Sequence, residues 1–245
     1  MRLFGLIGYP LSHSFSKEYF TKKFEIEKLT NCRYENFPIA SIAEIKNILH
    51  NKLELVGLNV TIPYKQQVIS YLHHASPVVQ VIGACNCIHL KNGQLHGHNT
   101  DVIGFKKSLE KYLQPHHTKA LILGSGGVSK AVEYVLSKLN IRFQVVSRNP
   151  DNTQLNYRLL SKSIIQEHLL LINTTPLGTF PNTEDAPEIP YELLTPNHYL
   201  FDVVYNPPST KFLKMGQEKG AKTQNGLEML QIQADESWKI WNEID

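Results

Sequence analysis

A glycine-rich turn between an apolar run and a helix-forming segment is the feature that most constrains the fold of this chain. Residues 118–123 have the length and continuous apolar character of a buried parallel strand. Gly124 permits a tight turn, Gly126 lets the backbone approach a bound group, and Gly127 is expected to keep the next helix close. A helix over 128–139 would point its N-terminal amides at an anion. The sequence therefore predicts a Rossmann-type unit that holds the pyrophosphate of a dinucleotide.

The residues after the next expected strand, 142–146, indicate which dinucleotide is bound. An Asp or Glu in this place holds the ribose 2′-hydroxyl of NAD and would repel a 2′-phosphate. Here Ser147 and Arg148 stand instead. Because an arginine offers charge-assisted hydrogen bonds to a phosphate, the predicted cofactor is NADP. The alternative is that Arg148 is only a solvated residue at a strand end.

Length and composition agree with a globular protein of two domains. The chain has 245 residues, 42% hydrophobic and 19% charged residues, and a formal net charge of +3 that is spread along the sequence. No clustered basic face points to nucleic acid, and no apolar stretch approaches the roughly 20 residues that span a bilayer. With no recognisable signal peptide and only three cysteines, we expect a cytoplasmic location.

Strand and helix patterns alternate along the chain, which predicts the α/β class. Asn92-Gly93 is a strong signal for a hairpin between the strands expected at 85–90 and 94–98. Apolar runs predict further strands, and helical spacing predicts helices. The expected strands cover 3–7, 33–39, 55–62, 169–173 and 199–204, and the expected helices cover 14–29, 41–50, 76–83, 102–113 and 226–242, with another beginning near 64–65.

Polar residues gather in the loops that follow the expected strands, where an α/β sheet binds ligands. Each has an ordinary structural explanation as well. One serine of 12–16 and the pair Thr100-Asp101 are suited to capping helices, and Lys65 could be a surface lysine. A lysine in the first turn of a helix is disfavoured by the helix dipole, which makes Lys65 the more notable of these.

Cys85, Cys87, His96 and His98 lie on the two strands of the expected hairpin and invite comparison with a zinc site. Residues two apart on a strand are about 7 Å from each other, whereas structural zinc sites use looser spacings on turns. We therefore expect no metal site.

Taken in order, the motifs of this chain resemble those of the shikimate dehydrogenase family. The resemblance covers essentially the whole sequence, and eight motifs in the same order are far more specific than any one of them. They are GYPLSHSFS at 8–16, NVTIPYK at 59–65, GACNC at 83–87, GHNTDVIG at 97–104, GSGG at 124–127, INTTPLG at 172–178, DVVYNP at 202–207 and NGLEML at 225–230, followed by Gln233.

The resemblance implies the reversible NADPH-dependent reduction of 3-dehydroshikimate to shikimate, in chorismate and aromatic amino acid biosynthesis. It implies an N-terminal α/β substrate-binding catalytic domain at 1–100, a Rossmann-type NADP-binding domain at 101–225, a cleft between them, and a C-terminal helix at about 226–245 packing back on the first domain. The implied substrate-binding residues are Ser14, Ser16, Thr61, Lys65, Asn86, Asp101, Tyr205 and Gln233. The implied cofactor-binding residues are Gly124, Ser125, Gly126, Gly127, Val128, Ser147, Arg148, Val203 and Gly226.

Residue chemistry supports a role for Lys65 and Asp101 in catalysis. Hydride transfer to a ketone creates an alkoxide that must receive a proton, and the reverse reaction needs a base. Lys65 can donate a proton as an ammonium, and Asp101 would favour that protonated form. Hydroxyl and amide side chains suit a polyhydroxylated ring.

This sequence departs from the family at one cofactor-binding position. The family often has a second basic residue a few positions after the arginine, but Asn152 stands here, so a single arginine would face the 2′-phosphate. Two alternative functions therefore stay open. A quinate or quinate/shikimate dehydrogenase that uses NAD or NADP is the first alternative, and a non-catalytic nucleotide-binding relative is the second. The sequence does not choose between a monomer and a homodimer.

Overall fold

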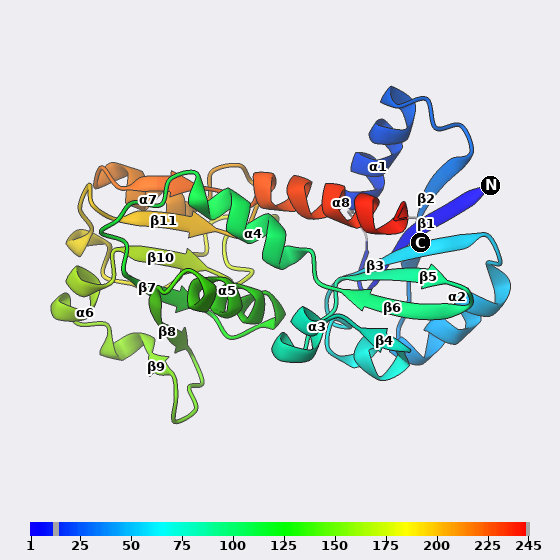
Figure 1. The fold of residues 1–245 in the computed structure, drawn as a ribbon. Coiled ribbons are helices and arrows are strands. Elements are labelled where there is room, and N and C mark those ends of the chain that lie inside the picture. The colour runs from blue at the N-terminus through cyan, green and yellow to red at the C-terminus, as the bar shows by residue number, and fades with distance from the viewer. Residues whose placement is uncertain (12–14, 244–245) are drawn as a thin grey trace. The chain divides into compact units, whose positions relative to one another are not determined.

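The computed structural model describes residues 1–11 and 15–243, and within them the chain divides into two compact units (Figure 1). The first unit contains Met1–Ile103 and the residues from Gln233 onward, and the second contains Gly104–Ile232. Helices α4 (Asp101–Glu110) and α8 (Leu227–Trp241) each contribute residues to both units. No helix among the described residues is long and apolar enough to cross a membrane.

The first unit is built on a mixed six-stranded sheet in the order β2-β1-β3-β5-β6-β4. Strands β1, β2 and β3 run parallel, and β5 pairs antiparallel with both β3 and β6. The strands are β1 (Arg2–Gly8), β2 (Cys32–Pro38), β3 (Leu55–Val60), β4 (His74–Ala75), β5 (Cys87–Lys91) and β6 (Gln94–His98). The helices are α1 (Phe15–Ile26), α2 (Ile45–Asn51) and α3 (Pro77–Ile82), with 3-10 helices η1 (Ile42–Glu44) and η2 (Gln67–Tyr71).

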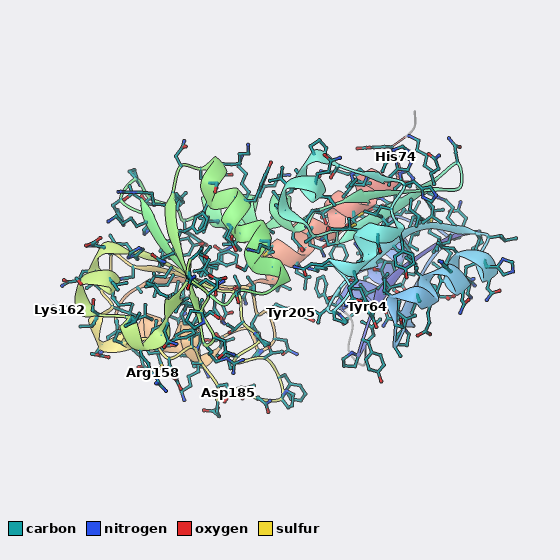
Figure 2. All side chains as sticks on the ribbon, turned by 90° about the horizontal axis from the view of Figure 1, so that it is seen from below. Tyr64, His74, Arg158, Lys162, Asp185 and Tyr205 are labelled. Atoms are coloured by element: carbon teal, nitrogen blue, oxygen red, sulfur yellow. The ribbon has the colours of Figure 1, made fainter. Side chains whose placement is uncertain are left out.

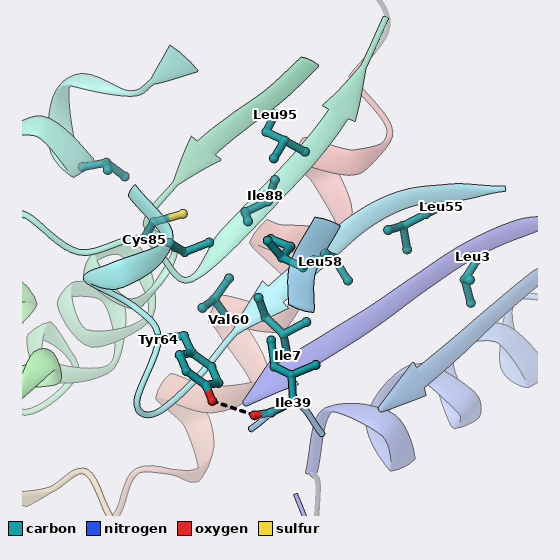
Figure 3. Packing of buried hydrophobic residues seen from close by; sticks show 13 residues of the cluster. Leu3, Ile7, Ile39, Leu55, Leu58, Val60, Tyr64, Cys85, Ile88 and Leu95 are labelled. Atoms are coloured by element: carbon teal, nitrogen blue, oxygen red, sulfur yellow. Dashed lines mark hydrogen bonds between the residues drawn. The ribbon is translucent and has the colours of Figure 1, made fainter. Parts of the chain in front are cut away.

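Alternating side chains of β1 serve two hydrophobic clusters, one on each face of this sheet. Leu3 and Ile7 belong to a cluster with residues of α2, η2 and α3, part of which Figure 3 shows. Phe4 belongs to an aromatic cluster with residues of α1 and α8, where its ring stacks on Trp241 at a centroid distance of 5.0 Å. The sheet is thus covered on both faces, and α8 is fixed to it by Trp241.

The second unit is a parallel six-stranded sheet in the order β12-β11-β10-β7-β8-β9. This is the strand order of a doubly wound dinucleotide-binding fold, with the reversal of order between β7 and β10. The strands are β7 (Lys119–Leu123), β8 (Arg142–Ser147), β9 (Leu155–Asn156), β10 (Leu170–Asn173), β11 (Tyr199–Asp202) and β12 (Lys222–Gln224). The helices are α5 (Gly127–Lys138), α6 (Lys162–Glu167) and α7 (Lys211–Glu218), with η3 (Tyr157–Leu159) and η4 (Tyr191–Leu193).

The α/β class and the Rossmann-type topology predicted from the sequence are confirmed. The hairpin prediction is confirmed in detail, because Asn92 and Gly93 both have positive φ, 52° and 74°, between Lys91 and Gln94 of the paired strands. The helix expected to begin near 64–65 is wrong: Lys65 lies in a turn, and only the 3-10 helix η2 follows. The argument from a helix dipole at Lys65 therefore does not apply.

Candidate functional site

Lys65 and Asp101 form an ion pair in the first unit. The Lys65 Nζ lies 2.7 Å from Asp101 Oδ2, and the two side chains are only 14% and 10% exposed. Lys65 stands in the turn after β3, and Asp101 is the first residue of α4. A short contact between two largely buried charges is a strong charge-assisted hydrogen bond, so the lysine is held at a fixed place.

Neighbouring contacts anchor both ends of this pair. Tyr64 is buried, and its hydroxyl donates to Ile39 O at 2.6 Å, which ties down the turn that carries Lys65 (Figure 3). The Cys85 amide donates to Lys65 O at 2.7 Å. On the other side, Asn99 Oδ1 accepts from the Val102 amide at 3.3 Å and caps the helix that begins with Asp101. The sequence predicted the two charged residues, and these contacts explain why they meet.

Asn86 and Gln233 are brought together by Thr100, which is fully buried. The Thr100 amide donates to Asn86 Oδ1 at 2.7 Å, and Asn86 Nδ2 donates to Thr100 Oγ1 at 3.0 Å. Thr100 Oγ1 also donates to Gln233 Oε1 at 3.3 Å. Two residues that the sequence predicts to bind substrate are therefore neighbours, although 147 positions separate them.

A buried chain of hydrogen bonds continues from this cluster. Ser237 Oγ lies 3.2 Å from Thr100 Oγ1, and it accepts from Asn59 Nδ2 at 3.0 Å. Tyr34 donates to Asn59 Oδ1 at 2.8 Å and also hydrogen-bonds with Ser16, while burial raises the pKa of the Tyr34 phenol. Ser16 is thus connected to the Thr100 cluster through side chains of β2, β3 and α8. Sequence reasoning missed Tyr34 and Ser237, because each sits in an ordinary amphipathic pattern.

The remaining substrate-site predictions of the first unit are Thr61 and Ser14. Thr61 is half-buried at the end of β3, and its amide donates to Ile7 O at 2.9 Å. A Cβ on Gly8 would lie 2.4 Å from Thr61 Cγ2, so only glycine allows the threonine this place. Ser14 lies outside the described residues.

A pocket of about 590 Å³ opens in the second unit at the reversal of strand order. The loops after β7, β8 and β10 supply most of its wall, and a later loop and η3 supply the rest. The lining residues are Gly124, Ser125, Gly126, Ser147, Arg148, Asn149, Tyr157, Thr174, Thr175, Pro176, Leu177, Asp185, Ala186 and Glu188. Five of these were predicted to hold the cofactor. Gly127, Val128, Val203 and Gly226 were predicted as well but do not line this pocket.

The glycine-rich turn leaves open space at the N-terminus of α5. Gly124 has φ +110°, and a Cβ there would lie 2.7 Å from Thr175 Cγ2. Gly126 is the N-cap residue of α5, and a Cβ on it or on Gly127 would meet nothing within 4 Å. The space that a pyrophosphate needs at the helix N-terminus is therefore present. The expectation that Gly127 serves close helix packing is wrong, whereas Ser129 is fully buried in that packing.

Charges of both signs line the pocket. Arg148 is exposed, and its guanidinium has no hydrogen bond or ion pair with any other described residue. It is thus available to an anionic ligand. Asp185, labelled in Figure 2, and Glu188 are also exposed and line the same pocket. No sequence pattern indicated that these two carboxylates would share a pocket with Arg148.

Val203 and Gly226, both predicted to bind the cofactor, lie side by side. The Gly226 amide donates to Val204 O at 3.0 Å, and a Cβ on Gly226 would lie only 2.2 Å from Val203 O. Tyr205, half-buried, follows on the same loop (Figure 2). Within residues 1–11 and 15–243, no three His, Cys, Asp or Glu side chains are grouped as a metal site.

Comparisons with known proteins agree with this geometry. The family model described as shikimate dehydrogenase substrate binding domain matches residues 6–88. A shikimate dehydrogenase (NADP(+)) of Methanococcus vannielii is 35% identical over 260 residues, which cover 98% of this chain and 90% of that protein.

Solved structures are similar over the full length. The structure of shikimate 5-dehydrogenase from Thermus thermophilus in complex with NADP(H) and shikimate matches with a TM-score of 0.88 at 29% identity, covering 100% of this chain and 94% of that one. A quinate dehydrogenase from Corynebacterium glutamicum in complex with NAD matches with a TM-score of 0.87 at 26% identity, covering 99% and 94%.

Proposed function

The chain belongs to the shikimate dehydrogenase family, and we propose that it catalyses the reversible reduction of 3-dehydroshikimate to shikimate with NADPH. The observation that carries the proposal is the Lys65–Asp101 ion pair, with Nζ and Oδ2 2.7 Å apart. A protein that only binds a nucleotide has no need of a buried proton-transfer pair. The product would enter chorismate and aromatic amino acid biosynthesis.

The cofactor would be held by residues of the second unit. The backbone of Gly124, Ser125 and Gly126 would hold the pyrophosphate at the N-terminus of α5, and Ser147 and Arg148 would hold the 2′-phosphate. The open space beside Gly126 and Gly127 and the unpaired guanidinium fit these groups. Val203 and Gly226 would lie beside the nicotinamide, and Gly127 and Val128 would complete the phosphate contacts. NADPH supplies the hydride when it is bound.

Lys65 would donate or accept the proton that the reaction requires. In the reducing direction its ammonium donates a proton to the oxygen that gains negative charge, and it recovers one from solvent. In the oxidising direction the neutral amine accepts the hydroxyl proton. Asp101 holds the Lys65 amine in place through the 2.7 Å contact between Nζ and Oδ2. The pair can therefore serve both directions.

The substrate would be held by hydroxyl and amide side chains together with the charged pair Lys65 and Asp101. Ser14 and Ser16 would bind the carboxylate, and Thr61, Lys65, Asn86 and Asp101 would bind the ring hydroxyls near the reacting carbon. Tyr205 and Gln233 would complete the site. Buried hydrogen-bonding groups select against an analogue that lacks a hydroxyl, because such an analogue leaves them unpaired.

The test is turnover in four pairings, with shikimate or quinate and with NADP or NAD, followed by the near-ultraviolet absorbance of the reduced cofactor. Fast turnover with shikimate and NADP alone supports the proposal. Comparable rates with quinate or NAD would move the assignment to a broader quinate/shikimate dehydrogenase, a candidate favoured by the similarity to the quinate dehydrogenase. Binding of NADP without turnover in any pairing would contradict the role of Lys65 and Asp101.

We further propose a cytoplasmic location. The protein would be a monomer or a homodimer, and solution scattering would distinguish the two. The three cysteines are free, and the thiols of Cys85 and Cys87 are buried, as suits a reducing compartment.

A further inference from the structure

Asp202 is a fully buried carboxylate at the end of β11, in the second unit. Its Oδ1 accepts from Asn173 Nδ2 at 2.9 Å and from the Val204 amide at 3.0 Å. Its Oδ2 accepts from the Thr210 hydroxyl at 2.5 Å. Three donors from three separate segments therefore converge on one side chain.

The burial of Asp202 is not offset by an ion pair with any residue that the structure describes. Among the described residues, no Lys, Arg or His nitrogen lies within ion-pair distance of Asp202. Burial raises the pKa of the Asp202 carboxyl to about 6, even though all three donors favour the charged form. A buried carboxylate of this kind costs stability at neutral pH, so its presence calls for a reason other than packing.

One of the three donors, Asn173, directly precedes the segment 174–177 that lines the nucleotide pocket. Asn173 ends β10, and its Oδ1 accepts from the amide and hydroxyl of Thr175, a lining residue of the pocket. Thr210 is the N-cap residue of α7. Val204 is the residue whose carbonyl accepts from Gly226. Asp202 thus connects the loop after β10 to its own loop and to the start of α7.

The register of the sheet makes this connection rigid. Asn173 pairs with Asp202 on one side and with Leu123 on the other, so the ends of β7, β10 and β11 are level. The Thr174 hydroxyl donates to Leu123 O at 3.0 Å and to Gly124 O at 3.1 Å. The Val203 amide donates to Asn173 O at 3.0 Å, so a change at Asp202 would act first on residues 203–205, which directly follow this point of attachment between β10 and β11.

We propose that Asp202 is a positioning residue that fixes the segment Val203–Tyr205 relative to the Thr175 side of the nucleotide pocket. The inference rests on the proposed function, in which Val203 lies beside the nicotinamide and Tyr205 contacts the substrate. Asp202 itself touches neither ligand. It sets the place of the two residues that do.

Two substitutions separate hydrogen bonding from charge. Asp202→Ala leaves the Asn173, Val204 and Thr210 donors without an acceptor, which frees the loop. Asp202→Asn keeps the shape and one acceptor oxygen for Asn173 and Val204, while its amide donates to the Thr210 oxygen. Ser108→Ala is the matched control, because Ser108 is equally buried in the same unit and accepts from Gln224 Nε2 at 2.6 Å.

The experiment measures kcat, the KM of both substrates and the Kd of NADPH for each variant, with circular dichroism to verify folding. We expect Asp202→Ala to lower kcat by roughly 10- to 100-fold, because small misplacements of reacting groups are costly. The Kd of NADPH should change by less than about threefold, since most binding energy comes from the phosphates. Asp202→Asn should recover kcat to within about threefold of the wild type, and Ser108→Ala should match the wild type.

The fluorescence of bound NADPH provides a readout without turnover, because it reports the surroundings of the nicotinamide. Asp202→Ala should shift this emission and Asp202→Asn should not. If the wild type has no activity, the proposed function fails. The fluorescence emission of bound NADPH in the two variants still tests whether Asp202 positions the segment Val203–Tyr205. Unchanged kcat and emission in folded Asp202→Ala would overturn the inference, and so would an Asp202→Asn variant as impaired as Asp202→Ala.

Discussion

Lys65 Nζ lies 2.7 Å from Asp101 Oδ2, and this pair joins the turn after β3 to the first residue of α4. Neither the turn nor the helix start would bring the charges together alone. The bonds of Tyr64 to Ile39 and of Asn99 to the backbone hold the two segments. The pair is therefore a product of the fold of the first unit, and it is ready before substrate arrives.

Replacing Lys65 with Ala should abolish most of the catalytic activity and have a smaller effect on substrate binding. Positioned proton transfer contributes about 10²- to 10⁴-fold, so kcat should fall by that order with a smaller change in KM. Steady-state kinetics with shikimate and NADP measure both. Lys162→Ala is the control, because Lys162 is an exposed lysine of the other unit (Figure 2). A large rise in KM with kcat intact would contradict the proton-transfer role and leave Lys65 with substrate binding alone.

Arg148→Gln should weaken NADP and leave NAD almost unchanged. The exposed Arg148 guanidinium lines the pocket, and hydrogen bonds to charged groups contribute about 1.5–3 kcal/mol, which corresponds to roughly a 10- to 100-fold loss. The ratio of kcat/KM for the two cofactors measures the effect. Arg158→Gln, at an exposed arginine of the same unit, should leave the ratio unchanged (Figure 2). Equal losses with both cofactors would remove Arg148 from contact with the 2′-phosphate.

Glu188→Gln should have the opposite effect on cofactor choice. Glu188 lines the pocket together with Arg148, and its carboxylate repels a 2′-phosphate that NAD lacks. Because both groups are exposed and screened, we expect the kcat/KM ratio of NADP over NAD to rise only about two- to fivefold. Glu184→Gln serves as the control, since Glu184 is an exposed residue of the same loop outside the pocket lining. Because salt screens this repulsion, the effect of Glu188→Gln on the kcat/KM ratio of NADP over NAD should shrink from low to moderate salt. An effect that does not depend on salt would contradict this electrostatic explanation.

Asp202→Asn should change how stability depends on pH. The folded-state pKa of Asp202 is raised to about 6, so between about pH 4 and pH 6 the folded protein binds a proton that the unfolded chain releases. The stability from this group is fully present below about pH 4 and is lost as pH rises through about 6, a loss of about 3 kcal/mol in all. The Asp202→Asn variant should not show this loss of stability, because an asparagine side chain does not titrate in this range.

Urea unfolding of both proteins across this range is the measurement. The D202N variant should be more stable than the wild type near neutral pH, and the difference should shrink toward about pH 4. If the free energies of unfolding of the wild type and the variant depended on pH in the same way, Asp202 would not titrate with a raised pKa.

The sequence predicted elements where the determining interactions are local. Asn92-Gly93 is the clearest case, because the turn depends on the φ preferences of those two residues alone. The prediction of a helix at Lys65 was wrong because the interaction that decides the structure there is not local. The sequence pattern there does not reveal that Tyr64 is buried and bonded to Ile39, and this long-range contact favours a turn.

The candidate site was predictable as a set of residues but not as a network. Lys65, Asn86, Asp101 and Gln233 lie in recognisable motifs, whereas Ser237 is an ordinary position of a helix. Its bond to Asn59 joins residues 178 positions apart, and that pairing arises only when α8 packs on the first sheet. Contacts of this kind follow from tertiary packing, which local propensity does not encode.

The packing of Trp241 against β3 yields a prediction about stability. Trp241 is nearly fully buried and donates from Nε1 to Ile88 O at 2.9 Å. A Cβ on Gly57 would lie 2.2 Å from the same Nε1 and 2.4 Å from Cδ1 of the indole ring. Gly57→Ala must therefore displace the indole or the strand, and overpacking of this kind costs about 1–3 kcal/mol. Chemical unfolding should show a midpoint lowered accordingly.

The double variant separates this steric cause from a loss of strand propensity. Trp241→Ala alone should be destabilising by about 3–5 kcal/mol, since it removes a large buried side chain. Adding Gly57→Ala to it should cost almost nothing more, because the atoms that the new methyl group meets are gone. Additive losses would mean that Gly57 is required by the backbone of β3 and not by the indole that packs on it.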